Sequence, residues 1–166
     1  MTIIKIYSII HGILQFPGGY ALDLSHGKYL SVDYGDVRTG LATCDPSGLI
    51  AEGLETVRKG GMRNTAIYVA EQAKKLGCKK IIVGLPKNMD GSEGNRAETV
   101  GAFIELLRAE TELPIDTMDE RMTTMIAYRY LGASEVYGKK RKGAVDTLSA
   151  EIILQDYLDR ERKGNI

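Results

Sequence analysis

The chain has 166 residues, with 22 Lys and Arg balanced by 22 Asp and Glu, which fits one globular domain. Charged residues make up 27% and hydrophobic residues 43%, so the composition excludes a disordered or fibrous protein. No segment approaches the roughly 18 apolar residues of a membrane span. The two cysteines, Cys44 and Cys78, are too few for a disulfide scaffold. We therefore expect a cytoplasmic protein that has no membrane contact.

Residues 1–27 differ in composition from the rest of the chain. They are mostly apolar, carry one Lys and one Asp, and contain both histidines, His11 and His26. A lone Lys before an apolar run faintly resembles a signal peptide, but no clear cleavage site follows. We expect an N-terminal extension, either poorly ordered or produced by a start upstream of the native one, before a domain over residues 28–162. Because that domain lacks histidine, its chemistry must rely on carboxylates, with a hard metal ion where one is needed.

The first elements of the predicted domain are short strands. Residues 28–34 and 40–44 have the alternating apolar side chains of two strands, and residues 54–58 alternate in the same way. Gly35 and a Pro-Ser-Gly turn close the first two strands. Because the connections are only a few residues long, we predict an antiparallel meander.

From Met62 onward the spacing of apolar residues becomes helical. The remaining pattern predicts, in order, a helix that ends at Gly77, a strand around 81–83 that is buried on both faces, a helix over 100–107, a strand from Pro114, a helix over 122–131, a loop over 134–143 and a final helix over 144–162. This order predicts an α/β fold with one mixed sheet and helices on its faces.

Acidic residues stand where the predicted elements begin or end. Asp33 lies near the end of the first strand, Asp119 and Glu120 follow the last strand, and Asp146 lies near the start of the final helix. Each position has an ordinary structural explanation, as a turn residue, a helix cap or a charge that complements the helix dipole. If the first and last strands run parallel, however, their acids emerge at the same edge of the sheet, and Asp146 can cover them from its helix.

Carboxylates that converge on one pocket need cations if all of them are to stay ionised. Mg²⁺ and Mn²⁺ prefer oxygen ligands, and two such ions about 4 Å apart support in-line cleavage of a phosphodiester. This chemistry requires no histidine, so it suits the composition of the domain. The sequence therefore favours a metal-dependent nuclease.

Several basic residues lie close in sequence to the predicted acidic residues. A basic run is most often a solvated surface, but beside a metal site it predicts contacts with a phosphate backbone. The candidate residues for binding nucleic acid are Lys87, Asn88, Arg96, Arg121, Lys139, Lys140, Arg141 and Lys142.

Several motifs, taken together, resemble one family. DYG with RTGLA, VGLPKNMDGSEG, DERMTT and KKRKGAVDTLSAEIIL are similar, in order and wording, to the YqgF (RuvX-type) family, and the resemblance covers roughly residues 29 to 160. It implies a ribonuclease H-like fold with a five-stranded mixed sheet and a metal-dependent nuclease site. It also implies a cytoplasmic role in maturing the 5′ end of small-subunit ribosomal RNA precursor, and some members are described as Holliday junction resolvases.

The resemblance also implies roles for individual residues. Asp33 matches the first-strand aspartate, Asp119 and Glu120 match the DER acids, and Asp146 matches the aspartate of the last helix. Asp33, Glu120 and Asp146 are then the expected metal ligands, although sequence cannot choose between Asp119 and Glu120 because neighbouring strand residues point to opposite faces. Nucleases of this superfamily generally carry a second acid on the strand beside the first. Here that strand ends in VGLPKN, without a carboxylate, so the DER acids must substitute from about 5 Å farther away.

Three functions remain in view. A nuclease acting on structured RNA is the leading hypothesis, with Mg²⁺ or Mn²⁺ as its cofactor. A Holliday junction resolvase acting on branched DNA is the alternative, and it would need a homodimer to cut two strands symmetrically. A non-catalytic RNA-binding assembly factor is the third, and it would need the basic residues but not the acids. The sequence leaves open whether the chain is a monomer or a homodimer.

Overall fold

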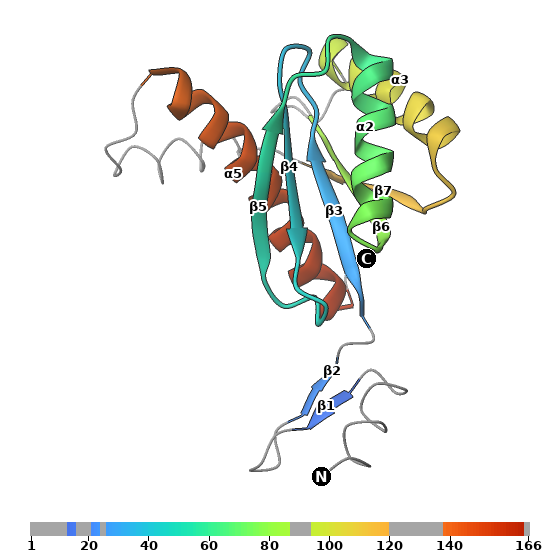
Figure 1. Cartoon of the computed structure of the whole chain (residues 1–166), viewed down its shortest axis with the longest axis vertical. Coiled ribbons are helices and arrows are strands. Elements are labelled where there is room, and N and C mark those ends of the chain that lie inside the picture. The colour runs from blue at the N-terminus through green and yellow to red at the C-terminus, as the bar shows by residue number, and fades with distance from the viewer. Residues whose placement is uncertain (1–12, 16–20, 24–25, 87–93, 120–137, 165–166) are drawn as a thin grey trace.

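A five-stranded mixed sheet forms the centre of the computed structural model, which describes residues 13–15, 21–23, 26–86, 94–119 and 138–164 (Figure 1). The strands lie in the order β5-β4-β3-β6-β7. They are β3 (Lys28–Asp33), β4 (Thr39–Cys44), β5 (Ala51–Val57), β6 (Cys78–Leu85) and β7 (Ile115–Asp119). The predicted α/β fold with one mixed sheet is confirmed.

The strand directions place the carboxyl ends of β3, β6 and β7 at the same edge of the sheet. Strands β3, β4 and β5 form the predicted antiparallel meander, whereas β6 runs parallel to both β3 and β7. Val83 pairs with Val32 on one side and with Thr117 on the other. Asp33 and Asp119, which follow these residues in their own strands, therefore reach the same edge, with β6 between them.

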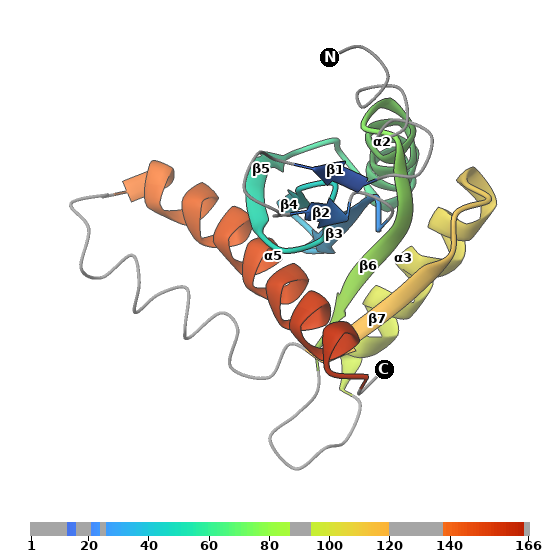
Figure 2. The same ribbon diagram turned by 90° about the horizontal axis from the view of Figure 1, so that it is seen from below.

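Helices cover both faces of the sheet. Helices α2 (Met62–Lys75) and α3 (Asn95–Glu110) pack on one face, and α5 (Gly138–Arg162) crosses the other (Figures 1 and 2). Because side chains alternate along a strand, Leu30 and Val32 of β3 join the core under α2 and α3. The intervening Ser31 faces α5, where its hydroxyl donates to the carbonyl oxygen of Ala150 at 2.6 Å.

Two glycines let α5 approach the sheet closely. A Cβ at Gly40 of β4 would overlap the backbone of Asp146, and a Cβ at Gly53 of β5 would come within 2.6 Å of the Thr147 side chain. A hydrogen bond of 2.8 Å between the hydroxyls of Thr56 and Thr147 holds the same turn of α5. This contact fixes the part of the helix that carries Asp146 against the antiparallel strands.

The basic run was expected in a loop, and that expectation is wrong. Helix α5 already begins at Gly138, so residues 139–142 form its first turns and Asp146 lies in its third turn rather than near its start. Lys and Arg are good helix formers, and one internal glycine, Gly143, costs only about 1 kcal/mol, so the run continues the helix. The helix predicted over 122–131 lies outside the described residues.

The N-terminal segment contains a small ribbon of its own, formed by β1 (Ile13–Gln15) and β2 (Ala21–Asp23), which pair antiparallel. His26 contacts the domain, and its Nε2 lies 3.0 Å from a carboxylate oxygen of Glu161. Gly27 donates its amide to the carbonyl oxygen of Pro46 at 3.0 Å. The predicted boundary at residue 28 remains a prediction. Among the helices of the described ranges, none is both long and apolar enough to cross a membrane.

Candidate active site

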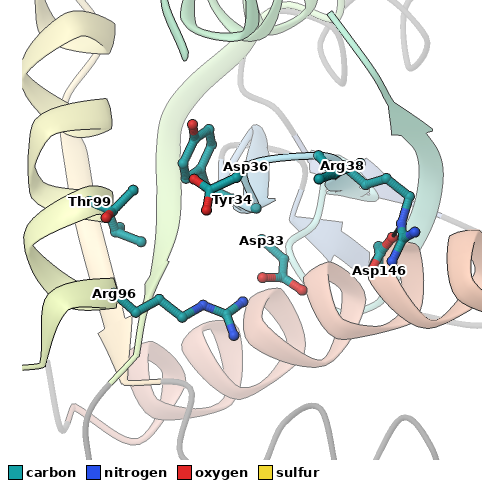
Figure 3. Close-up of a pocket in the computed structure, with 10 residues that line it drawn as sticks. Asp33, Tyr34, Asp36, Arg38, Arg96, Thr99 and Asp146 are labelled. Carbon is teal, nitrogen blue, oxygen red and sulfur yellow. Dashed lines mark hydrogen bonds and ion pairs between the residues drawn. The ribbon is translucent and has the colours of Figure 1, made fainter. Parts of the chain in front are cut away.

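Asp33 and Asp146 meet in a pocket of about 370 Å³ at the carboxyl edge of β3 (Figure 3). Asp33 comes from the end of β3 and is only 8% exposed, while Asp146 reaches the pocket from α5. The pocket is lined by Asp33, Tyr34, Gly35, Asp36, Val37, Arg38, Arg96, Thr99, Val100 and Asp146. Two of the predicted acids are thus brought together by the packing of α5 on the sheet.

The Asp33 carboxyl lies in an environment that opposes its ionisation. Burial raises its pKa to about 6, the positive charge of Arg96 works against this shift, and the negative charge of Asp146 adds to it. Two carboxylates in one partly dry pocket destabilise each other unless positive charge lies nearby. The site is therefore built to accept additional cationic charge.

Ser149 adds an unused polar group next to Asp33. It lies one turn after Asp146 on α5, is 1% exposed, and favours the charged form of the Asp33 carboxyl. Its Oγ nevertheless has no hydrogen-bond partner of regular geometry among the described residues. Because a buried hydroxyl without a partner costs about 1–3 kcal/mol, its place beside the carboxylate suits a bound water or ligand.

Two arginines supply the positive charge of the pocket. Arg96, in the first turn of α3, extends its guanidinium toward Asp33 (Figure 3). Arg38, in the turn between β3 and β4, donates a hydrogen bond from Nε to Oδ2 of Asp146. The Arg38 side chain is 25% exposed and that of Asp146 is 20% exposed, so their ion pair is partly shielded from water. Each of the two acids is thus faced by its own guanidinium.

Asp119, the third predicted acid among the described residues, lies outside the pocket of Asp33 and Asp146. It ends β7, two strands from β3, and does not line the pocket. On β7, Met118 packs in the core under α5, whereas Ile115 packs under α2 and α3. By alternation, Asp119 falls on the α2 and α3 face, opposite to the face of Asp33.

The other predicted site residues are placed only in part. Arg96 lies at the acids, and residues 139–142 precede Asp146 on the same helix. Within the described ranges, no group of three acidic, cysteine or histidine side chains is arranged to hold a metal ion. The predictions that lie outside the described residues are Lys87, Asn88, Glu120 and Arg121.

Arg38, Asp36 and Ser149 belong to the site but were not among the predicted residues. Arg38 could have been found from the hairpin, because Asp33 pairs with Gly40 and the short turn between them stays close to the end of β3. Ser149 could have been found from helical spacing, because it lies at i+3 from Asp146. Asp36 offered no signal apart from its place in that turn.

Comparisons with known proteins identify the family of this chain. The model of the family described as "RuvX: Holliday junction resolvase" matches residues 27–160. A protein of Desulforamulus reducens named "Putative pre-16S rRNA nuclease" is 38% identical over 136 residues, which cover 82% of this chain and 99% of that protein. A protein of the same name from Clostridioides difficile is 40% identical over 133 residues, covering 80% and 94% of the two chains.

A solved structure shares the fold. RuvC of Thermus thermophilus in complex with a Holliday junction substrate superposes with a TM-score of 0.53 at 16% identity, covering 84% of this chain and 98% of that one. At this level of identity the likeness concerns the fold alone. It confirms the expected ribonuclease H-like architecture.

Proposed function

Because this chain belongs to the RuvX family, we propose that it is a metal-dependent nuclease that matures the 5′ end of pre-16S ribosomal RNA in the cytoplasm. The observation that carries the proposal is the convergence of Asp33 and Asp146, from a strand end and a helix, on one pocket that two arginines also line. A fold alone does not define a function, but this arrangement of charges suits phosphodiester cleavage.

The residues of the pocket fit a hard divalent cation. Asp33 and Asp146 supply carboxylate oxygens, and the orphaned hydroxyl of Ser149 offers a further polar contact for a bound water. Asp33, Asp146 and Glu120 would hold Mg²⁺ or Mn²⁺. Two such ions, when bound, would activate a water molecule and neutralise the charge of the leaving oxygen.

Glu120 is a better candidate than Asp119 for the third ligand. Alternation along β7 puts the Asp119 side chain on the face away from Asp33, which is a poor position for the third ligand. The longer side chain of a glutamate also suits a ligand that must reach the pocket from beyond β7, two strands away from β3. Asp119 would then support the strand end rather than bind an ion.

The protein groups around the acids suit an anionic substrate. Arg96 holds its guanidinium beside Asp33, where it can donate to phosphate oxygens as well as stabilise the carboxylate. Residues 139–142, in the first turns of α5, would extend the surface for nucleic acid together with Lys87, Asn88 and Arg121. The net charge of the chain is zero, and in this proposal its acidic residues gather in the pocket while its basic residues contact the substrate.

Cleavage of branched DNA is a second candidate function. The family is described as a Holliday junction resolvase, and a resolvase with the same fold binds such a junction. A resolvase must cut two strands symmetrically, so this activity requires a homodimer. A non-catalytic RNA-binding assembly factor remains the third candidate, and it would not require Asp33 or Asp146.

A cleavage assay distinguishes the three candidates. The full chain is incubated with a pre-16S RNA fragment or a four-way DNA junction, with Mg²⁺ or with EDTA. We expect metal-dependent cleavage of the RNA, at least 100-fold slower in Asp33→Asn and Asp146→Asn, which remove ligand charge without changing side-chain shape. Asp156→Asn is the matched control, because Asp156 is an exposed acid of α5 outside the pocket. Cleavage that persists in Asp33→Asn would overturn the proposed site.

A further inference from the structure

Arg38 forms an ion pair with Asp146, one of the carboxylates that the proposed metal site requires. Its Nε donates to Oδ2 of Asp146, and both side chains line the pocket that contains Asp33. A guanidinium keeps its positive charge throughout the physiological pH range. Arg38 therefore cannot yield to an incoming cation by losing a proton and must change its position instead.

A divalent cation and Arg38 compete for the same group. An ion bound by Asp33 and Asp146 would lie beside the guanidinium, and two positive charges at such a distance repel each other in a partly buried site. Arg96 already supplies positive charge on the Asp33 side. The ion pair between Arg38 and Asp146 thus opposes metal binding in the free protein.

The displaced guanidinium has a second partner within reach once nucleic acid is present. Arg38 lies at the end of the turn between β3 and β4, and Figure 3 shows its side chain reaching toward α5 from that turn, on the other side of Asp33 from Arg96. The planar fork of a guanidinium matches two oxygens of a phosphate group. A phosphate held over Asp33 would lie between Arg38 and Arg96.

We propose that Arg38 exchanges partners, from Asp146 in the free protein to a backbone phosphate of the bound nucleic acid when a divalent cation takes its place. This inference rests on the proposed function and adds a positioning residue to it. Because metal and nucleic acid both benefit when Arg38 leaves Asp146, each strengthens the binding of the other. The exchange restricts full metal loading to the complex with nucleic acid.

The test measures metal binding and RNA binding separately on the full chain. Mn²⁺ is titrated by calorimetry without nucleic acid, and the affinity for a pre-16S RNA fragment is measured with Ca²⁺ and again with EDTA. For Arg38→Gln we expect about tenfold tighter Mn²⁺ binding, about tenfold weaker RNA binding with Ca²⁺, and less than a twofold change with EDTA. Arg38→Lys keeps the charge and should hold the Mn²⁺ affinity within about threefold of the wild type.

Arg160→Gln is the matched control. Arg160 forms an exposed pair with Asp156 on the same helix, at 2.9 Å and outside the pocket, and its loss should change neither affinity. A merely structural role of Arg38 would weaken both metal and RNA binding, so opposite changes are diagnostic. Equal or weaker Mn²⁺ binding by Arg38→Gln would overturn the exchange. If neither the wild type nor Arg38→Gln binds Mn²⁺, or if Asp146→Asn binds it as tightly as Arg38→Gln does, the proposed metal site fails as well.

Discussion

Gly40 lies against the backbone carbonyl of Asp146, and no side chain larger than a hydrogen fits between them. The contact joins the second strand of the sheet to the third turn of α5. Since Asp33 pairs with Gly40 across the hairpin, one residue links the positions of both acids. The spacing of the two acids in the pocket therefore depends on this glycine.

Replacing Gly40 with alanine should separate the two acids. We expect Gly40→Ala to lower the free energy of unfolding by about 2 kcal/mol, as overpacking does, and to reduce cleavage at least tenfold because Asp146 moves with its helix. Chemical denaturation and the RNA cleavage assay measure the two effects. The control is Gly101→Ala on α3, where no atom lies near the added methyl group, so that stability should rise slightly and activity should stay the same. Wild-type activity in Gly40→Ala would contradict the proposed link.

Asp33 should make the metal-free protein less stable at neutral pH. Its pKa is raised to about 6 in the folded chain, mainly by burial, against about 3.9 in an unfolded chain. A raised carboxyl pKa favours the folded state below about pH 4, and the penalty grows as the pH rises from 4 to 6. We expect Asp33→Asn to raise the free energy of unfolding by up to about 3 kcal/mol above pH 6 and to have little effect at pH 4.

Denaturation in EDTA between pH 4 and pH 8 measures this difference. Adding Mn²⁺ should stabilise the wild-type chain and leave Asp33→Asn unchanged, because only the wild type binds the ion. Asp156→Asn, an exposed acid on α5, should show no such pH-dependent gain. If Asp33→Asn is less stable than the wild type at pH 7 in EDTA, the carboxylate is not under the electrostatic strain inferred from the pocket.

The sequence allowed much of the fold and half of the site to be predicted. The uninterrupted apolar residues of β6 predicted a parallel strand that is buried on both faces, and the short turns predicted the antiparallel meander. Parallel β3 and β7 then put Asp33 and Asp119 at one edge, as the strand pairing confirms. These features were predictable because they depend on the local spacing of apolar residues and on whether neighbouring strands run parallel or antiparallel.

The remainder depends on packing that no local pattern encodes. The start of α5 was predicted six residues too late, because a run of like charges is equally compatible with a loop and with a helix. The roles of Arg38 and Ser149 arise only when α5 docks on the sheet, through close approaches at Gly40 and Gly53. Sequence spacing alone cannot reveal such a contact between distant elements.

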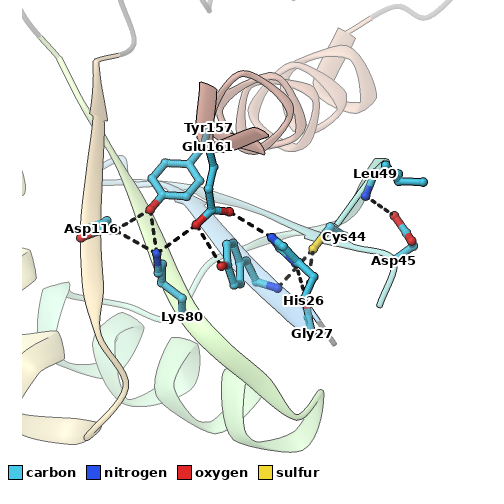
Figure 4. A network of polar contacts seen from close by, with 10 residues as sticks. His26, Gly27, Cys44, Asp45, Leu49, Lys80, Asp116, Tyr157 and Glu161 are labelled. Atoms are coloured by element: carbon cyan, nitrogen blue, oxygen red, sulfur yellow. Dashed lines mark hydrogen bonds and ion pairs between the residues drawn. The ribbon is translucent and has the colours of Figure 1, made fainter. Parts of the chain in front are cut away.

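Glu161 belongs to the polar network of Figure 4 and should anchor the C-terminal end of α5, several turns away from Asp146. It accepts a hydrogen bond from the Tyr29 hydroxyl at 3.1 Å and lies 3.0 Å from Nε2 of His26 and 3.5 Å from Nζ of Lys80. Burial alone would raise its pKa, but these partners outweigh burial and lower it. We expect Glu161→Gln to lower the free energy of unfolding by about 1 kcal/mol at pH 7, with unchanged cleavage.

The pH dependence provides a second check on Glu161. A lowered carboxyl pKa gives stability that is complete above the unfolded pKa of about 4.3 and is lost as the pH falls through the folded pKa. The difference between the wild type and Glu161→Gln should therefore shrink below about pH 4. Glu105→Gln, in an exposed pair with Arg108, is the control and should have little effect at any pH. A cleavage defect in Glu161→Gln would show that the two ends of α5 are coupled.

The first turns of α5 should bind the phosphate backbone without taking part in cleavage. Changing all four basic residues at 139–142 to glutamine keeps the helix propensity, because glutamine is also a good helix former. If each contacts a phosphate, the slope of log affinity against log salt should fall by about 3, and the affinity should weaken for RNA of any sequence. Lys74→Gln with Lys75→Gln, at the exposed end of α2, is the control and should leave the slope unchanged. A salt slope equal to that of the wild type would remove this segment from the nucleic-acid interface.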